Sequence, residues 1–289
     1  MYKEVVALYG VPRSGTSWLG EIINSCPDTA YRFQPLFSYR FKSRITTESS
    51  VEDMEQFFRE LYDEDADDFL NCTEKREQGM YPVFHNKKLH PSILVFKEVR
   101  YLYTIPLLLK RYEKIKIAGI VRNPYDVLES WMNAPAEYKP GWDIFREWNF
   151  AVSKNEYRPE NYYGYYKWKE WMKLNADMKE QYPDRFITVR YEDLEDDAYH
   201  TVEKLFGYLH MPFTNQTAEF IQASQSRTVD SIKSVYRKRR GAERRRQYHL
   251  PEEIRVRISQ DLKDFPEAGL FGYAAEVSLI KHKAEESTR

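Results

Sequence analysis

Short apolar runs alternate with longer amphipathic segments along this chain, and this alternation restricts the fold more than any other feature of the sequence. Four runs of β-branched or apolar residues are typical of buried strands: Val5–Tyr9, Ile93–Phe96, Ile115–Val121 and Phe186–Val189. Strands separated by helices form a parallel sheet that those helices cover. We therefore expect an α/β fold, a three-layer sandwich in which helices flank a central parallel sheet.

Helical periodicity fills the segments between and after these strands. The predicted helices are Thr16–Ser25, Val51–Tyr62, Tyr125–Asn133, Glu160–Glu180, Ala198–Leu209 and Pro251–Lys263. The sequence contains no Gly/Ser-rich or Pro-rich linker, which favours one domain over residues 1–280, followed by a polar tail over residues 281–289.

Composition excludes several classes of protein. Apolar residues make up 42% of the 289 residues and charged residues 31%, so the chain can bury a core and is neither disordered nor collagen-like. No segment approaches the roughly 18 uninterrupted apolar residues of a membrane span. The formal net charge of −1 argues against a nucleic-acid interface spread over the whole domain.

Cysteine usage bears on the cellular compartment. The chain has two cysteines, Cys26 and Cys72, which are too few for a disulfide framework and favour a reducing compartment. The first residues lead directly into a predicted strand and do not resemble a secretory leader. These observations predict a cytoplasmic protein, with a trimmed lumenal domain as the alternative. They leave open whether it forms a homodimer.

A glycine-bearing turn, Gly10–Gly15, joins the first predicted strand to the first predicted helix. Such a turn aims backbone N–H groups at one point, and the helix dipole adds positive potential, so a phosphate or a similar anion binds there. The two glycines have the spacing of a Walker A loop, but Thr16 stands where that motif requires lysine, and the cation of the turn is Arg13. The turn therefore predicts a site for an anion other than a nucleoside triphosphate. The alternative interpretation is an ordinary βα turn without a ligand.

A second strand end carries a similar arrangement. The predicted strand Ile115–Val121 ends at Arg122, which is followed by Asn123 as a helix N-cap and Pro124 as the first helical residue. In open α/β sheets the ligand lies at the carboxyl ends of the strands. Two anion sites on neighbouring strands predict one ligand with two separated anionic groups. For the second motif alone, the alternative is a purely structural helix cap.

Four motifs, in order along the chain, resemble those of the sulfotransferases that use 3′-phosphoadenosine 5′-phosphosulfate (PAPS). Gly10–Leu19 resembles the 5′-phosphosulfate loop, in the arginine-bearing form of carbohydrate sulfotransferases, and Arg122–Ser130 resembles the 3′-phosphate motif. The other two are Arg190–Leu194, directly after the fourth predicted strand, and the segment from Arg237 to Tyr248. The resemblance covers most of the chain. It implies a P-loop-like fold, with PAPS as donor, PAP as product and no metal.

The same resemblance implies roles for individual residues. Arg13 would neutralise the bridging oxygen of the phosphosulfate as the bond breaks, and Lys97 would contact the sulfuryl oxygens, although a surface lysine is the alternative for Lys97. Trp18 would stack on the adenine, with Tyr191 near the base. The turn would supply donors from Ser14, Gly15, Thr16 and Ser17. The 3′-phosphate would be held by Arg122, Ser130, Arg237 and Lys238.

Transfer to a hydroxyl group also needs a general base. In sulfotransferases that act on tyrosine or heparan chains, a glutamate in the loop after the first helix fills this role. In the corresponding loop here, Cys26–Leu36, the matching residue is Gln34, and an amide cannot accept a full proton at neutral pH. We predict that Glu98 replaces it, with His85 in reserve; a structural role is the alternative for Glu98.

Two further segments have an unusual composition. Five of the six tryptophans lie between Trp131 and Trp171, and we expect this segment to form part of the core and part of a pocket for a hydroxylated sugar or a phenol. The run Arg237–Arg246 carries seven cations in ten residues. We interpret that run as neutralising the cofactor phosphates or attracting an anionic glycan, and a nucleic-acid patch is the alternative.

Together these observations predict a PAPS-dependent sulfotransferase that moves a sulfuryl group to an acceptor hydroxyl by in-line displacement without a metal. The acceptor is a small molecule or a glycan, with a carbohydrate favoured. Two alternatives stay open. One is a nucleotide-dependent kinase with a degenerate P-loop, which Thr16 disfavours; the other is a PAP- or glycan-binding protein that has lost its base, which Gln34 suggests.

Overall fold

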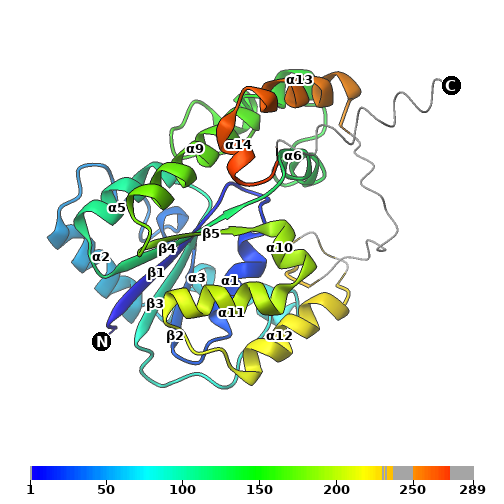
Figure 1. Cartoon of the computed structure of the whole chain (residues 1–289). Helices are drawn as coiled ribbons and strands as arrows, with labels where there is room; N and C mark the ends of the chain where they lie inside the picture. The colour runs from blue at the N-terminus through cyan, green and yellow to red at the C-terminus, as the bar shows by residue number, and fades with distance from the viewer. Residues whose placement is uncertain (1, 230, 232, 237–249, 274–289) are drawn as a thin grey trace.

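Five parallel strands form the centre of the protein in a computed structural model that describes residues 2–229, 231, 233–236 and 250–273. The strands are β1 (Glu4–Tyr9), β2 (Thr29–Phe33), β3 (Ile93–Glu98), β4 (Ile115–Val121) and β5 (Phe186–Arg190). Their order in the sheet is β2-β3-β1-β4-β5, and every neighbouring pair is parallel (Figure 1). The predicted α/β fold with a central parallel sheet is confirmed.

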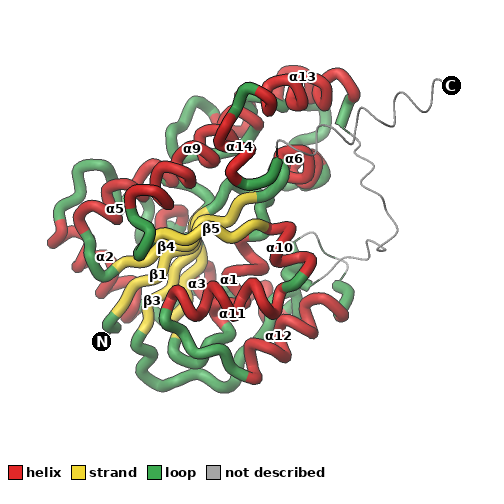
Figure 2. Tube along the Cα trace, in the orientation of Figure 1, coloured by secondary structure: helices red, strands yellow, loops and turns green. Residues whose placement is uncertain are grey.

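Helices connect the strands and cover both faces of the sheet (Figure 2). Two single-turn 3₁₀ segments, Pro35–Phe37 and Leu102–Thr104, follow β2 and β3. The α-helices are α1 (Thr16–Asn24), α2 (Val51–Asp63), α3 (Asp68–Asn71), α4 (Thr73–Glu77), α5 (Ile105–Arg111), α6 (Pro124–Met132), α7 (Ile144–Glu147), α8 (Val152–Asn155), α9 (Tyr165–Gln181), α10 (Tyr191–Asp196), α11 (Ala198–Leu209), α12 (Asn215–Ser226), α13 (Glu252–Lys263) and α14 (Pro266–Leu270).

The sheet separates two hydrophobic cores because successive side chains of a strand point to opposite faces. Val5, Ala7 and Tyr9 of β1 pack into one core with residues of α2, α5, α6 and α9. Val6 and Leu8 pack into the other core with residues of α1, α11 and α12. Every residue of β1 from Val5 to Tyr9 is fully buried. This two-sided burial explains why the strand is an uninterrupted apolar run.

The strand β2 is absent from the predicted elements. Its sequence, Thr29–Phe33, includes a threonine and an arginine and has no apolar run, so it lacks the signal by which the other strands were predicted. It is nevertheless buried along its whole length at the edge of the sheet. Arg32 is compatible with this burial because its Nε donates a hydrogen bond to the carbonyl oxygen of Leu61 at 3.0 Å. The four predicted strands and six predicted helices are all present, although α9 begins at Tyr165, five residues after the predicted start.

The strand order brings three strand ends together. β1 lies between β3 and β4, so the turns that follow these strands meet at the carboxyl edge of the sheet. From β1 the chain continues to β2, on one side of β1, and from β3 it crosses to β4, on the other side of β1. This change of direction makes the carboxyl edge at β1 a topological switch point. A ligand crevice is expected here.

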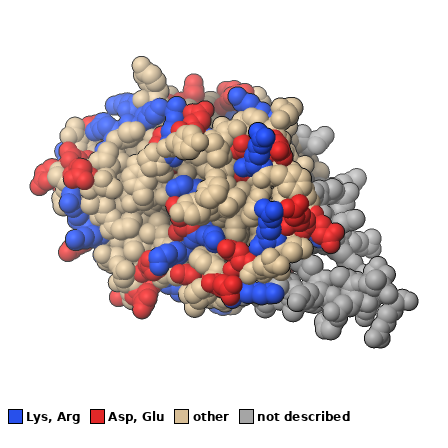
Figure 3. All heavy atoms as spheres, turned by 90° about the horizontal axis from the view of Figure 1, so that it is seen from above, with Lys and Arg blue, Asp and Glu red and all other residues tan. Residues whose placement is uncertain are grey.

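The surface is mixed in charge, and cationic and anionic side chains are interspersed on the face shown in Figure 3. Among the described residues, no helix is long and apolar enough to cross a membrane. Cys26 and Cys72 are both buried and not disulfide-bonded. The basic run Arg237–Arg246 and the predicted tail, 281–289, lie outside the described residues.

Candidate active site

A cavity of about 730 Å³ opens at this edge of the sheet, a size typical of small-molecule sites. Both predicted anion-binding turns contribute to its lining. The predicted site residues that line it are Arg13, Gly15, Thr16, Ser17, Trp18, Lys97, Arg122, Ser130 and Tyr191. Residues separated by more than 170 positions in the chain therefore share one pocket.

The turn after β1 is left-handed at two positions. The backbone angle φ is 73° at Arg13 and 90° at Gly15, a conformation that costs residues other than glycine about 1–2 kcal/mol. α1 begins at Thr16, and within the described part of the chain no side chain caps its N-terminus. The first N–H groups of this helix therefore keep their hydrogen-bonding capacity beside a cavity that Gly15–Ser17 line, as an anion site requires.

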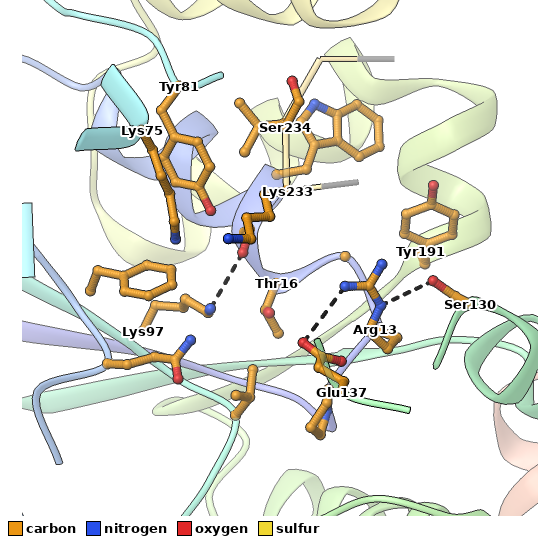
Figure 4. Close-up of a pocket in the computed structure, with 18 of the residues that line it drawn as sticks. Arg13, Thr16, Lys75, Tyr81, Lys97, Ser130, Glu137, Tyr191, Lys233 and Ser234 are labelled. Atoms are coloured by element: carbon orange, nitrogen blue, oxygen red, sulfur yellow. Dashed lines mark hydrogen bonds and ion pairs between the residues drawn. The ribbon is translucent and has the colours of Figure 1, made fainter. Parts of the chain in front are cut away.

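Arg13 links the two anion-binding turns (Figure 4). Its Nε donates a hydrogen bond to Ser130 Oγ at 3.1 Å, and its carbonyl oxygen accepts one from Arg122 Nη1 at 3.0 Å. The Arg13 guanidinium also lies 3.8 Å from a carboxylate oxygen of Glu137. The predicted meeting of Arg13 and Arg122 in one pocket is what the structure shows.

Ser14 lies below the turn. It is fully buried, it is outside the described lining of the cavity, and its Oγ has no hydrogen-bond partner among the described residues. Ser14 therefore does not bring its hydroxyl to the ligand in this conformation.

The second turn is built as its sequence predicts. Asn123 caps α6, since its side chain accepts a hydrogen bond from the N–H of Tyr125 at 2.9 Å, and Pro124 is the first helical residue. The N–H of Asn123 donates to Glu192 Oε1 at 2.9 Å, so the Arg190–Leu194 motif fixes the start of this turn. Arg122 then lies with its guanidinium carbon 4.0 Å from the centre of the Tyr191 ring.

Trp18 and Tyr191 form the aromatic end of the pocket. Their ring centres are 6.1 Å apart with an angle of 67° between the planes, so the two rings meet edge to face. The indole N–H of Trp18 donates to Ser224 Oγ at 2.9 Å, which fixes the orientation of the ring. A flat heterocycle can stack on a ring that is held in this way.

We predict that Gly15→Ala abolishes most of the affinity for PAP, because an added Cβ would lie 2.5 Å from Tyr191 Cδ2 and φ is left-handed. Calorimetric titration should show a dissociation constant raised at least about tenfold. Gly207→Ala is the matched control: nothing lies within 4 Å of its added Cβ in α11, so PAP should bind normally. Equal PAP affinity in the two variants would contradict this account of the turn.

Lys97 is buried at the end of β3 and is not a surface lysine. Its ammonium lies 3.4 Å from Ser17 Oγ and 4.2 Å from the centre of the Phe33 ring, and the ammonium of Lys75 lies 3.9 Å from the centre of the same ring. Burial, and then the charge of Lys75, lowers the pKa of Lys97 to about 7. Burial also lowers the pKa of Lys75. Two cations thus lie close together in the pocket.

This environment predicts a pH-dependent affinity for PAP. A bound anion favours the protonated form of Lys97, whose pKa is about 7 in the free protein, so binding should take up a proton. The affinity should then fall as the pH rises above 7, by at most about tenfold per pH unit. Calorimetry in buffers of different ionisation enthalpy measures the uptake, which Lys97→Met should reduce. The same uptake in both proteins would count against Lys97.

Glu98 lies on the other face of β3. Its partner in the sheet is Tyr9, whereas Lys97 pairs with Leu8, and successive residues point to opposite faces. Glu98 is fully buried, it is outside the described lining of the cavity, and its Oε1 accepts a hydrogen bond from the N–H of Leu36 at 2.7 Å. Burial raises its pKa to about 8. This geometry does not fit the predicted role of base and instead holds the turn that follows Gln34.

The reserve candidate, His85, is also outside the described lining of the cavity. Gln34 does line the cavity, in a left-handed conformation with φ of 45°.

Several pocket residues have no counterpart in the predicted site. They are Phe33, Phe37, Phe69, Lys75, Tyr81, Val99, Arg100, Glu195 and residues 224–225 and 233–236. The segment between Trp131 and Trp171, which was expected to form part of a pocket, contributes Asn133, Glu137, Lys154 and Tyr163. Most lie in loops or in helices of four or five residues, whose sequences carry no periodic signal. Figure 4 shows Lys75, Tyr81 and Lys97 on one side of Thr16, and Arg13, Ser130 and Glu137 on the other.

The aromatic segment contributes less to the pocket than its composition suggests. Trp131, Trp148, Trp168 and Trp171 are buried in the core, and only Tyr163 among the aromatic residues of this segment lines the cavity. These tryptophans therefore belong to the part of the segment that was expected in the core. Their indole N–H groups have structural partners, as in Trp168, which donates to the carbonyl oxygen of Arg122 at 2.8 Å.

The fold and the pocket define an α/β protein that binds an anionic nucleotide at strand ends, with cations in place of a Walker A lysine. The model of the sulfotransferase family matches residues 6–215 of the chain. The chain therefore belongs to the sulfotransferase family, whose members take the sulfuryl group from PAPS. A comparison with curated protein sequences gives no match.

A solved structure supports the same fold. Mouse sulfotransferase SULT7A1, crystallised with PAP, is similar with a TM-score of 0.56 and 14% sequence identity, over 97% of this chain and 89% of the mouse chain. A sulfotransferase from Alicyclobacillus acidocaldarius matches with a TM-score of 0.48 and 14% identity, over 77% of this chain and 91% of its own.

Proposed function

We propose that this protein transfers the sulfuryl group of PAPS to a hydroxyl group of a carbohydrate. The observation that carries this proposal is the junction of the two strand-end turns, in which Arg122 donates a hydrogen bond to the carbonyl oxygen of Arg13 within one pocket. A ligand that needs both turns carries two anionic groups, as PAPS does.

The pocket fits this nucleotide in three respects. The N-terminus of α1 has no capping side chain, a Cβ at residue 15 would fill the space in front of Tyr191, and Arg122 Nε is buried without a hydrogen-bond partner among the described residues. When bound, PAPS supplies an electron-poor sulfuryl group that passes between two oxygens. Arg13 and Lys97 would stabilise the charge that develops, and Arg122 and Ser130 would hold the 3′-phosphate.

Glu137 is the group that we assign as the general base. It lines the pocket, and its Oε2 is buried without a hydrogen-bond partner among the described residues. Its charge acts on both Lys97 and Lys154, where it opposes the lowering of their pKa values by burial. The Glu137 carboxylate thus lies next to the cations of the donor half and has an oxygen without a hydrogen-bond partner among the described residues. It is positioned to accept the proton of an attacking hydroxyl.

The other half of the pocket supports a sugar as the acceptor. Its lining combines aromatic faces with the amide side chains of Gln34 and Asn133, a mixture that can stack on a ring and hydrogen-bond its hydroxyl groups. The aromatic residues are Phe33, Phe37, Phe69, Tyr81 and Tyr163.

Three further assignments are part of the proposal. Arg237 and Lys238, outside the described residues, complete the 3′-phosphate site. Residues 1–280 form one domain. The protein is cytoplasmic, which the two unpaired cysteines support.

Thermal-shift measurements with PAP, ATP and ADP, followed by labelled-sulfate transfer from PAPS to a pool of sugars and phenols, test this function. We expect PAP to stabilise the protein more than either adenine nucleotide, and label to appear on a sugar. Stronger stabilisation by ATP with Mg²⁺ would indicate a kinase. Normal PAP binding without transfer to any acceptor would indicate a binding protein.

A further inference from the structure

The pocket contains more cations than the nucleotide site uses. Arg13, Lys97 and Arg122 belong to the donor half, as argued above. Arg100 and Lys154 also line the cavity, and neither takes part in an ion pair among the described residues, although Glu137 lies in the same cavity. Neither cation is therefore neutralised by a contacting carboxylate among the described residues.

Arg100 and Lys154 converge on one side of the cavity. Arg100 follows β3, and its guanidinium carbon lies 3.9 Å from the centre of the Phe37 ring. Lys154 belongs to α8, and its ammonium lies 5.1 Å from the centre of the Tyr163 ring. Burial raises the pKa of Tyr163, and the charge of Arg100 opposes that rise, so both cations act at the same ring.

Physical chemistry limits what can bind there. Contact with an aromatic face stabilises a cation only in part, and a partly buried cation without an anionic partner is costly. The hydroxyl groups of a neutral sugar can accept hydrogen bonds from a guanidinium, but they do not neutralise its charge. A carboxylate neutralises it and also accepts two parallel hydrogen bonds from Arg100. A ligand whose ring stacks on Phe37 or Tyr163 and carries an acidic substituent would match this site.

We propose that Arg100 and Lys154 form an anion-binding subsite for the acceptor, so that the preferred acceptor is an acidic sugar. This inference rests on the proposed function and narrows its substrate class. The inference also explains how an acidic acceptor can bind near Glu137, which lies 3.8 Å from Arg13. The charges of Arg100 and Lys154 offset the repulsion between the Glu137 carboxylate and the acidic group of the acceptor.

Two commercial glycosides that differ at one carbon test the subsite. 4-Nitrophenyl β-D-glucuronide carries a carboxylate where 4-nitrophenyl β-D-glucoside carries a hydroxymethyl group. Calorimetric titration of the PAP-saturated protein should show the glucuronide binding at least about tenfold more tightly, the effect of one charge-assisted hydrogen-bonded pair. Arg100→Gln and Lys154→Gln should each reduce this preference severalfold, and neither should change the affinity for PAP.

Lys179→Gln, at an exposed position in the last turn of α9, is the control and should keep the full preference. Equal binding of the two glycosides, or binding of neither, would overturn the subsite, as would an unchanged preference in both variants. If PAP still binds and label is transferred to a neutral sugar, the proposed function stands without the subsite. If PAP does not bind, the proposed function fails and the subsite fails with it.

Discussion

Glu137→Gln should lower the turnover of sulfuryl transfer by about 10²–10⁴-fold, the usual contribution of a general base. The amide has nearly the same shape as the carboxylate, but it cannot accept the proton of the acceptor hydroxyl. The affinity for PAP should stay within a few-fold of the wild-type value, because the direct contact of Glu137 with the donor half is the 3.8 Å approach to Arg13 and its effect on Lys97 is only through charge. Labelled-sulfate transfer and PAP titration measure the two quantities separately.

Glu98→Gln is the matched control for that substitution. Its amide oxygen can still accept the hydrogen bond from the N–H of Leu36, so the turn after β2 should keep its conformation. We expect turnover close to the wild-type rate. The converse result, an inactive Glu98→Gln and an active Glu137→Gln, would return the role of base to Glu98.

Arg13→Ala should lower turnover by about 10²–10³-fold, the cost of losing one electrostatic donor at the site where charge develops. The guanidinium is held from two sides, by its hydrogen bond to Ser130 Oγ and by the nearby Glu137 carboxylate, and no other described cation occupies the centre of the turn after β1. The affinity for PAP should also fall. Steady-state kinetics with PAPS and titration with PAP measure the two effects.

Arg146→Ala, with a side chain that is 87% exposed, is the control for the loss of one arginine and should behave as the wild-type protein. Wild-type turnover in Arg13→Ala would exclude a direct role for the guanidinium in the reaction.

The sequence could predict that the two strand-end turns share one pocket because each turn is built from local signals. The turn at Gly10–Gly15 and the cap at Asn123 each lie within a few residues of a buried strand, and strand, turn and helix signals agree there. The parallel sheet then brings the two turns together, since the carboxyl ends of neighbouring strands share one edge. The predicted contact between the two motifs follows from this rule.

The acceptor half could not be predicted in the same way. Lys75 lies in a helix of five residues and Glu137 in a loop, where neither periodicity nor capping distinguishes a pocket residue from a surface residue. Their approach to the donor site depends on tertiary packing. In the tryptophan-rich segment, composition could not separate the two expected roles, and its tryptophans mainly fill the core.

Strand alternation separates two of the predicted catalytic residues. Lys97 and Glu98 are neighbours at the end of β3, so their side chains point to opposite faces of the sheet. Lys97 lines the cavity and Glu98 is outside its described lining. Strand periodicity therefore decides between adjacent candidates even where no structure is known.

One stretch of the chain supplies several residues of the acceptor half of the pocket. The donor half is supplied by the turns after β1, β4 and β5 and by Lys97 of β3, whereas Phe37, Phe69, Lys75 and Tyr81 all belong to the stretch between β2 and β3. That stretch forms none of the strand-end turns that hold the nucleotide. Insertions and substitutions within this stretch can accordingly change which acceptor is bound and leave the turns that bind the donor unchanged. Acceptor specificity can therefore diversify in this fold without a change in the donor site.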